Sequence, residues 1–354
     1  MNRRLQNIII TFLLVLVSAC NRDGPLLTDA PIESISRELD AVVPPLMKGH
    51  NVVGLSLVVI HEGKISLSKS YGYANLASKR IVDEHTVFRA ASLGKPIFAY
   101  IVVSLAQQRK IDLDVPLYTY LKEEVVKGDP RSKIITARMV LTHTTGLPNL
   151  DGRKSDIKFL FDPGTDFQYS GHAYLYLQKV IKKITGKHLN ELANELVFKP
   201  LKMADSSFVW QDKYRESISS SYDDSGGVFR SKEKPEIGYS AWSLFTSTKD
   251  YARFVIHMIE SSKIQNSVAA AMMKPQVDVA TNVKWGLGWG LQDTVPNYSF
   301  WHWGSMAGFR HYVVGYPKEK MAVIVMTNSW KAFKIIDDIM AKSIGGSYPS
   351  YDWF

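Results

Sequence analysis

Hydrophobic and polar positions divide the chain into segments with helical spacing and segments with strand-like alternation. Residues 31–47 carry apolar side chains three to four positions apart, which predicts an amphipathic helix. Residues 54–60 and 65–73 flank the turn His61-Glu62-Gly63-Lys64 and predict a β-hairpin. Residues 97–105 are apolar on nearly every side, so we expect a buried helix there.

The second half of the chain changes from helical to strand-like spacing. Residues 173–184, 249–259 and 331–344 predict further helices. Short apolar or aromatic runs separated by turns predict strands at 300–303, 309–316 and 321–327. Strands at both ends with helices between them predict an α/β (α+β) fold. Its antiparallel sheet is flanked by N- and C-terminal helices and carries an all-helical insertion domain.

This pattern also suggests domain boundaries. We expect residues 28–85 and 235–354 to form the sheet domain, with residues 86–234 as the helical domain. A basic start followed by a short apolar run identifies residues 1–19 as an export signal. Residues 20–27 are then a tether between that signal and the folded domain.

Cys20 is the only cysteine, and it follows the small residues Ser18 and Ala19 directly after the apolar run. This arrangement resembles the lipidation site of bacterial lipoproteins, whereas the alternative is a buried, inert thiol. The resemblance implies lipidation at Cys20 and a membrane-anchored protein facing the periplasm or the cell exterior.

Composition excludes several classes of function. The chain has 354 residues and a net charge of +9, but its 43 lysines and arginines are scattered. No dense basic tract is interleaved with aromatic residues, so we expect no nucleic-acid binding. No histidine or acidic cluster has metal-ligand spacing, and we expect neither a metal nor a cofactor. The oligomeric state stays open.

The first candidate for chemistry is Ser92-Leu93-Gly94-Lys95, which leads into the buried helix. Residues three apart share a helix face, so Lys95 would lie beside the Ser92 hydroxyl. A half-buried lysine near a helix N-terminus has a lowered pKa and can accept a proton. The same spacing recurs at Ser66–Lys69, Ser155–Lys158 and Ser231–Lys234, but none of these precedes an apolar helix.

Two further segments carry candidate side chains. Tyr169-Ser170-Gly171 lies on a loop before the helix at 173–184, where a tyrosine could relay protons beside lysine ammonium groups. Trp301-His302-Trp303-Gly304-Ser305 lies on a predicted edge strand, where a substrate backbone could pair. Taken alone, each tyrosine or histidine is more often a structural residue.

Taken together, Ser92-x-x-Lys95, Tyr169-Ser170-Gly171 and His302-Trp303-Gly304 resemble motifs of the serine β-lactamase and penicillin-binding-protein superfamily. The branch most similar contains class C β-lactamases, D-Ala-D-Ala carboxypeptidases and esterases. Matching runs extend over residues 30–345. They include Leu141-Thr142-His143-Thr144-Thr145-Gly146-Leu147-Pro148, Lys199-Pro200-Leu201 and Trp285-Gly286-Leu287-Gly288-Trp289.

The resemblance implies a role for each catalytic candidate. Ser92 is the nucleophile and Lys95 its activating partner. Tyr169 is the general base and protonates the leaving group. His302 occupies the position at which many members have lysine, and it helps to polarise the substrate and Tyr169.

The resemblance also implies a substrate-binding surface. The backbone N–H groups of Ser92 and Ser305 form the oxyanion hole, beside Gly304 and Gly171. Two positions depart from the family pattern. Gly171 replaces the asparagine of Tyr-x-Asn, and Trp303 replaces the threonine of Lys-Thr-Gly. Both changes weaken amide and carboxylate recognition, which β-lactam hydrolysis needs.

The sequence therefore predicts an exported, lipid-anchored serine hydrolase that cleaves a small ester, amide or peptide. Esterase or D-amino-acid peptidase activity fits better than the first alternative, β-lactamase activity. A second alternative is a non-catalytic lipoprotein that binds peptidoglycan or a partner protein. We interpret His143 and His172 as structural residues.

Overall fold

The computed structural model describes residues 24–150, 157–229, 234–294 and 297–353, and its centre is an antiparallel sheet. Within these residues the sheet has nine strands in the order β3-β2-β1-β11-β10-β9-β8-β7-β6. Strands from both ends of the chain meet where β1 pairs with β11, which confirms the predicted fold class. The strands are β1 (Gly54–His61), β2 (Lys64–Asn75), β3 (Arg80–Ile81), β6 (Val277–Ala280), β7 (Val283–Trp285), β8 (Gly290–Thr294), β9 (Asn297–Met306), β10 (Phe309–Tyr316) and β11 (Met321–Thr327).

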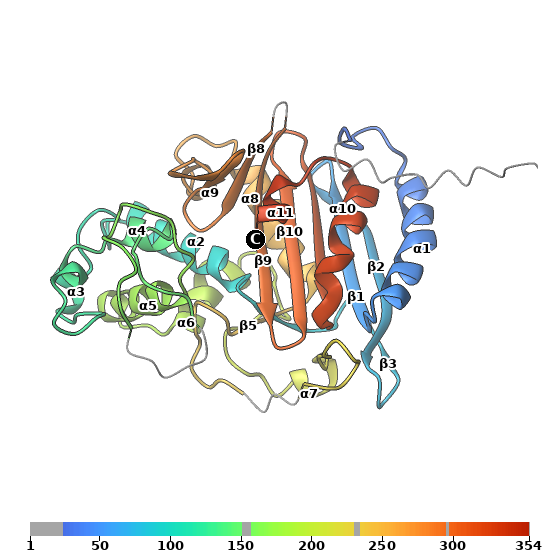
Figure 1. Cartoon of the computed structure of the whole chain (residues 1–354), viewed down its shortest axis with the longest axis horizontal. Helices are drawn as coiled ribbons and strands as arrows, with labels where there is room; N and C mark the ends of the chain where they lie inside the picture. The colour runs from blue at the N-terminus through green and yellow to red at the C-terminus, as the bar shows by residue number, and fades with distance from the viewer. Residues whose placement is uncertain (1–23, 151–156, 230–233, 295–296, 354) are drawn as a thin grey trace, which may run out of the picture.

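Helices surround this sheet, and most of the short ones lie in the middle of the chain (Figure 1). A separate two-stranded sheet joins β4 (Phe88–Ala91) to β5 (Leu244–Thr246). The α-helices are α1 (Ile32–Gly49), α2 (Gly94–Gln107), α3 (Tyr118–Leu121), α4 (Ala137–Leu141), α5 (Gly171–Thr185), α6 (Leu189–Ala193), α7 (Tyr214–Ser217), α8 (Thr248–Ser261), α9 (Val268–Met272), α10 (Ile336–Ile344) and α11 (Pro349–Trp353). Single turns of other helix types span Pro130–Lys133, Asn194–Phe198 and Trp330–Lys334.

Each face of the sheet is buried against different helices, because side chains alternate along a strand. On β1, Leu55, Leu57 and Val59 pack in one core with residues of α1 and α10. Val58 and Ile60 point the other way and share a second core with α2, α5 and α8. Figure 1 shows α10 in front of the sheet, α8 behind it and the helices α3 to α6 to one side.

Most of the predicted helices and strands are present. The hairpin turn places Glu62 at φ +52° and Gly63 at φ +74°, as a two-residue turn with two left-handed positions requires. The helix predicted at 331–344 is wrong in detail: a 3-10 turn (Trp330–Lys334) precedes α10, and Ile335 between them has φ −129°. Apolar spacing alone did not reveal this break.

The position of β9 corrects a second expectation. The strand is not at the edge of the sheet along its whole length, because β8 pairs with residues 297–301. That pairing ends at Trp301, whereas pairing with β10 continues to Met306. Within the described residues, the half of β9 that carries His302, Gly304 and Ser305 therefore has a strand on one side alone.

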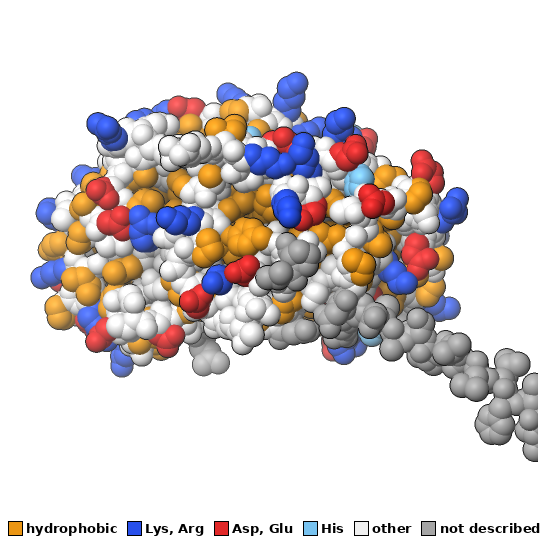
Figure 2. All heavy atoms as spheres, turned by 90° about the horizontal axis from the view of Figure 1, so that it is seen from above, with side chains coloured by type: hydrophobic (Ala, Val, Ile, Leu, Met, Phe, Trp, Pro, Cys, Tyr) orange, Lys and Arg blue, Asp and Glu red, His pale blue; other side chains and the backbone are white. Residues whose placement is uncertain are grey.

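The predicted export signal and Cys20 lie outside the described residues. At the end of the predicted tether, Leu26 forms a β-bridge with Gly345, and the Leu27 N–H donates to the Ile344 carbonyl at 2.9 Å. In the described part of the chain, none of the helices combines the length and apolar character needed to cross a bilayer. Seen from above, hydrophobic side chains gather in the middle of one face, with charged side chains around them (Figure 2).

Candidate active site

Ser92 lies in the tight turn that connects β4 to α2. Ala91, directly before it, has φ +51°, a left-handed conformation that is strained for a residue with a Cβ atom. The Leu93 N–H donates to the Ala90 carbonyl at 3.0 Å and closes the turn. Since α2 begins at Gly94, this turn exposes Ser92 next to the N-terminus of a helix whose residues are nearly all buried. Strained turns of this kind cluster at functional sites.

Lys95 points back at this serine from the first turn of α2. Its Nζ donates to Ser92 Oγ at 3.0 Å and to the Ala241 carbonyl at 2.8 Å. The side chain is 1% exposed, and none of the ion pairs in the described residues includes it. Burial lowers the pKa of Lys95 to about 7. A large fraction of the amine is therefore neutral near pH 7 and can accept the Ser92 proton.

Tyr169 approaches the same lysine from the loop before α5. Lys95 Nζ lies 4.7 Å from the centre of the Tyr169 ring. Burial raises the pKa of Tyr169 above its usual range, and the nearby Ser92 hydroxyl opposes this rise. A tyrosine beside lysine ammonium groups would titrate lower, but here the burial of Tyr169 itself dominates. Tyr169 consequently stays protonated and can donate a proton.

His143 lies behind Tyr169 and holds its loop in place. The two rings pack with centroids 4.3 Å apart, and His143 Nδ1 accepts the Ser170 N–H at 3.0 Å. Burial lowers the pKa of His143 well below its usual value. The Ser170 side chain caps α5 by accepting the Ala173 N–H at 3.1 Å. His143 thus has a structural role, as the sequence indicates. It holds the loop that carries Tyr169 in position. His172 lies in the first turn of α5.

His302 lies on β9, with its ring centroid 6.1 Å from that of Tyr169. Burial and the charge of Lys95 lower the pKa of His302 to about 3. The hydrogen bond to the Trp303 carbonyl opposes this shift. A neutral ring whose Nδ1–H donates to that carbonyl at 2.8 Å leaves Nε2 as an acceptor. His302 Nε2 and the Tyr169 hydroxyl are both buried without a hydrogen-bond partner among the described residues.

Gly304 and Ser305 follow on the same strand. A Cβ at Gly304 would lie 2.4 Å from the Ala90 carbonyl oxygen, so the close approach of β9 to β4 requires glycine there. Ser305 is exposed and pairs with Arg310 of β10. The backbone of β9 therefore runs beside the turn that carries Ser92, where the second oxyanion donor is expected.

The space near Gly171 is already filled. A Cβ at Gly171 would lie 2.7 Å from Leu150 Cγ and 3.2 Å from Asn149 Oδ1. Asn149 Oδ1 also accepts the Gly171 N–H at 3.0 Å. The Asn149 carboxamide thus lies beside the position where the family motif has an asparagine. Sequence reasoning missed Asn149, because only the folded loop brings it next to Gly171.

Trp303 contacts Tyr169. Its ring centroid lies 4.7 Å from that of Tyr169, although His302 and Gly304, its neighbours on β9, point to the other face of the sheet. The bulky ring therefore borders the candidate site.

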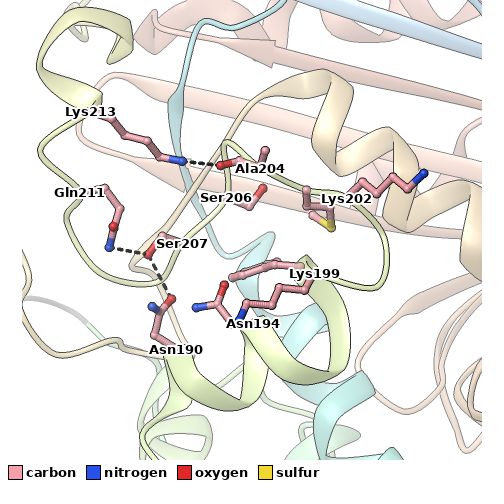
Figure 3. A pocket seen from close by; sticks show the side chains of 11 residues that line it. Asn190, Asn194, Lys199, Lys202, Ala204, Ser206, Ser207, Gln211 and Lys213 are labelled. Carbon is pink, nitrogen blue, oxygen red and sulfur yellow. Dashed lines mark hydrogen bonds between the residues drawn. The ribbon is translucent and has the colours of Figure 1, made fainter.

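Two other features lack a comparable arrangement. Ser66 and Lys69 lie on strand β2, where residues three apart face opposite sides, and Lys69 pairs with Asp40 at 2.7 Å. A polar cavity of about 390 Å³ lies near α6 (Figure 3). There Lys213 donates to the Ala204 carbonyl and the Lys202 amine points away from the other labelled side chains. Among the described residues, no group of three His, Cys, Asp or Glu side chains could hold a metal ion.

A family model described as Beta-lactamase matches residues 39–342, which is most of the chain. The chain belongs to the Beta-lactamase family. Members of this family are serine hydrolases, so the resemblance and the class of enzyme inferred from the motifs are confirmed at the level of the family.

Individual members of the Beta-lactamase family are distant. Protein flp of Staphylococcus aureus (strain MRSA252) is 22% identical over 323 residues, covering 82% of this chain and 62% of its own length. This chain therefore spans about three-fifths of that relative. Esterase EstB of Burkholderia gladioli is 29% identical over 214 residues, covering 52% of this chain and 54% of EstB. The D-alanine carboxypeptidase AmpC of Burkholderia cenocepacia shares the fold, with a TM-score of 0.77 and 18% identity over 88% of this chain and 99% of AmpC.

The pKa of Lys95 leads to a pH-dependent activity. For an ester substrate, kcat/KM should rise with pH along a curve with an apparent pKa of about 7, because only the neutral amine can accept the Ser92 proton. Steady-state rates between pH 5.5 and 9 would measure this curve. A rate that is flat over that range would contradict the assignment of Lys95 as base.

Lys95→Met is the matched control, because it removes the amine and keeps the length of the side chain. The variant should lose activity by about a thousandfold or more.

The same variant tests the effect of Lys95 on stability. The folded-state pKa of about 7 lies below the ordinary value of 10.5, so the full free-energy cost of burying the charged lysine is present below pH 7. At pH 6 the variant should therefore be more stable by about 1 to 3 kcal/mol, even after losing two hydrogen bonds. A less stable variant at pH 6 would argue against the buried, uncompensated amine.

Gly171→Asn restores the family residue and tests the packing at this position. Because the new Cβ collides with Leu150, the variant should be destabilised by about 1 to 3 kcal/mol, as urea unfolding measures. Adding Leu150→Ala should recover most of this loss, with the single Leu150→Ala variant completing the cycle. Unchanged stability of Gly171→Asn alone would show that Leu150 does not fill this space.

Proposed function

We propose that this chain is a hydrolase that cleaves an ester or a D-amino-acid amide through an acyl-enzyme on Ser92. The observation that carries the proposal is the bond of 3.0 Å between Lys95 Nζ and Ser92 Oγ in a buried setting. A neutral amine at this distance can deprotonate a serine hydroxyl without a histidine. Tyr169 and His302, drawn from distant parts of the chain, lie around the same pair of atoms.

Acylation follows from these positions. Ser92 Oγ attacks the substrate carbonyl carbon, and its proton moves to Lys95 Nζ. When the bond to the leaving group breaks, the Tyr169 hydroxyl gives its proton to the departing oxygen or nitrogen. The Lys95 ammonium then returns a proton to Tyr169, so both side chains end as they began. His302 Nε2, an acceptor in the neutral ring, can hold the Tyr169 hydroxyl in place between these transfers.

Deacylation uses the same groups with water in place of the leaving group. Water attacks the acyl-enzyme carbonyl carbon, and its proton moves to Lys95 Nζ. When the bond between the acyl carbon and Ser92 Oγ breaks, Lys95 passes that proton to Ser92 Oγ. Both steps build negative charge on the carbonyl oxygen, which the N–H groups of Ser92 and Ser305 are expected to bind. Gly304 supports this role, because its lack of a side chain lets β9 approach the Ser92 turn.

Esters and D-amino-acid amides fit this site better than β-lactams. EstB is named as an esterase and AmpC as a D-alanine carboxypeptidase, and both kinds of activity suit a serine with a lysine base. The positions that would recognise an amide and a carboxylate are Gly171 and Trp303. The first carries no side chain and the second carries an apolar ring, so neither offers a charged partner to a substrate carboxylate.

We also propose that the protein is exported and anchored in the membrane by lipid on Cys20. The support comes from the sequence, in which Cys20 follows a basic start, an apolar run and two small residues. The active site would then lie at a membrane surface, facing the periplasm or the cell exterior. Ester and peptide substrates of the cell envelope would be accessible there.

The activity is tested with the full chain in detergent and with its Ser92→Ala variant. Wild type should react with a fluorophosphonate probe and hydrolyse a short p-nitrophenyl ester, and Ser92→Ala should do neither. A D-Ala-D-Ala peptide and a chromogenic cephalosporin, tested beside the ester, separate peptidase and β-lactamase activity. We expect slower turnover of the cephalosporin than of the ester.

Three outcomes decide the proposal. Absence of labelling and of all turnover in wild type would favour the non-catalytic lipoprotein. Turnover that survives in Ser92→Ala would exclude Ser92 as the nucleophile. Rapid cephalosporin hydrolysis with slow ester hydrolysis would replace the proposed substrate class by β-lactams.

Lipidation of Cys20 is tested by mass spectrometry of the N-terminal peptide from cells. We expect a peptide that begins at Cys20 and carries acyl chains, and we expect Cys20→Ser to leave the membrane fraction. An unmodified Cys20, or a mature chain that starts elsewhere, would overturn the anchor.

A further inference from the structure

Aromatic rings extend from Tyr169 along one side of the candidate active site. The Trp303 ring lies 4.7 Å from Tyr169, and the Trp353 ring lies 6.3 Å from Trp303, measured between centroids. Phe167 completes the group at 5.7 Å from Trp353. All four side chains are half-buried, so each keeps part of its surface accessible. We call Phe167, Trp303 and Trp353 the aromatic wall.

Trp353 reaches this place through a built connection at the end of the chain. In α11, Ser350 Oγ donates to Gln292 Oε1 at 2.9 Å and lies 2.9 Å from the Tyr312 hydroxyl. Gln292 Nε2 donates in turn to the Ser347 carbonyl at 2.6 Å. Ser350 and Gln292 are fully buried, so these bonds are protected from water and fix the short helix against β8 and β10.

Helix α11 lies outside the residues that the family model matches. The match ends at residue 342, whereas α11 begins at Pro349. The chain turns back after α10, and Figure 1 places its end beside β9 in the middle of the molecule. The segment thus places Trp353 next to the strand that carries Trp303. Trp303 itself stands where the family motif has threonine.

The chemistry of the aromatic wall is apolar. Flat rings offer stacking and edge contacts worth more than their buried area alone, and they offer a carboxylate no compensation for its lost water. His302, at the lysine position of the motif, is neutral at physiological pH because burial lowers its pKa. A substrate carboxylate placed here would lose hydration without gaining an ion pair from the aromatic wall or from His302.

The contact with Tyr169 indicates which half of the substrate meets these rings. In the proposed function, Tyr169 donates its proton to the leaving group. A leaving group within reach of the Tyr169 hydroxyl therefore lies beside the ring that packs on Tyr169, which is Trp303. Acyl groups extend instead from the carbonyl carbon held between Ser92 and β9.

We propose that Trp303, Trp353 and Phe167 form the leaving-group subsite and that it takes an uncharged, flat, aromatic alcohol. This inference rests on the proposed function and narrows it to esters whose alcohol part is aromatic. The bond that breaks joins the acyl carbon to the alcohol oxygen, which receives the Tyr169 proton as the acyl group passes to Ser92.

The test compares benzyl acetate with ethyl acetate in the full chain in detergent. Both esters give the same acetyl-enzyme and their alcohols are similar in acidity, so a difference in kcat/KM reports on the leaving-group subsite. Wild type should prefer benzyl acetate. Trp353→Ala and Trp303→Thr should each lower the ratio of kcat/KM for benzyl acetate to kcat/KM for ethyl acetate by about tenfold.

Three further variants serve as controls. Trp353→Phe keeps a ring and should keep most of the preference. Trp210→Ala removes a tryptophan of the same size that contacts Tyr214 and Phe245, outside the aromatic wall, and should leave both rates unchanged. Ser92→Ala should abolish both rates. Thermal unfolding of every variant distinguishes the loss of a substrate contact from the loss of the fold. Trp353→Ala, near the end of the chain, is the variant we expect to affect folding least.

Failure of the subsite and failure of the function are distinguishable. If Ser92-dependent hydrolysis occurs but the preference for benzyl acetate is absent, or survives in both tryptophan variants, the subsite is overturned and the function stands. If the variants instead lose activity on ethyl phenylacetate and not on benzyl acetate, the rings bind the acyl group and our placement is overturned. If wild type neither cleaves any of these esters nor reacts with the fluorophosphonate probe, the proposed function itself is wrong.

Discussion

The site depends on the burial of one amine. Lys95 is enclosed by protein with a serine hydroxyl and a backbone carbonyl as its partners, and no carboxylate pairs with it among the described ion pairs. Enclosure without a counter-charge lowers the pKa of the amine, since the ammonium form loses its hydration and gains too little in return. The fold thereby gives up stability to obtain a base beside Ser92.

Burial also sets the charge of the groups around Lys95. Tyr169 retains its proton because burial penalises the phenolate by more than the nearby Ser92 hydroxyl stabilises it. His302 stays neutral because burial and any remaining charge on Lys95 both disfavour a second cation. The resting site therefore contains a protonated tyrosine, a neutral histidine and a lysine that is partly neutral near pH 7, with little net charge. Preorganised dipoles act strongly on charge that develops in such a site.

Much of this arrangement could be predicted from the sequence. The pair Ser92 and Lys95 follows from helical spacing, and the sheet follows from alternating runs at both ends of the chain. Motif order then suggested Tyr169 and His302 as neighbours of this pair. The direction of the Tyr169 pKa could not be predicted, because it depends on how completely the fold buries Tyr169 itself.

Other features needed the folded chain for similar reasons. Asn149 is distant in sequence from Gly171. The two residues meet because Asn149 and Leu150 lie against the start of α5. The partly unpaired half of β9 depends on where β8 ends, which no local pattern records. The helix break at Ile335 involves a backbone angle rather than a change in hydrophobic spacing. The place of Trp353 beside Trp303 depends on tertiary contacts, among them the buried hydrogen bonds of Ser350.

The three departures from the family motif are consistent with each other once the charge of the site is considered. A glycine at 171 removes a polar contact, and a tryptophan at 303 replaces another with a ring, while the histidine at 302 replaces a permanent cation with a neutral base. Each change alone would weaken recognition of a charged, amide-rich substrate. Together with Trp353 of α11, they replace polar groups of the motif with apolar ones and leave Ser92 and Lys95 in place. A site that is nearly uncharged at rest gains most from a substrate that is itself uncharged, because neither partner then has to lose the hydration of an ion on binding.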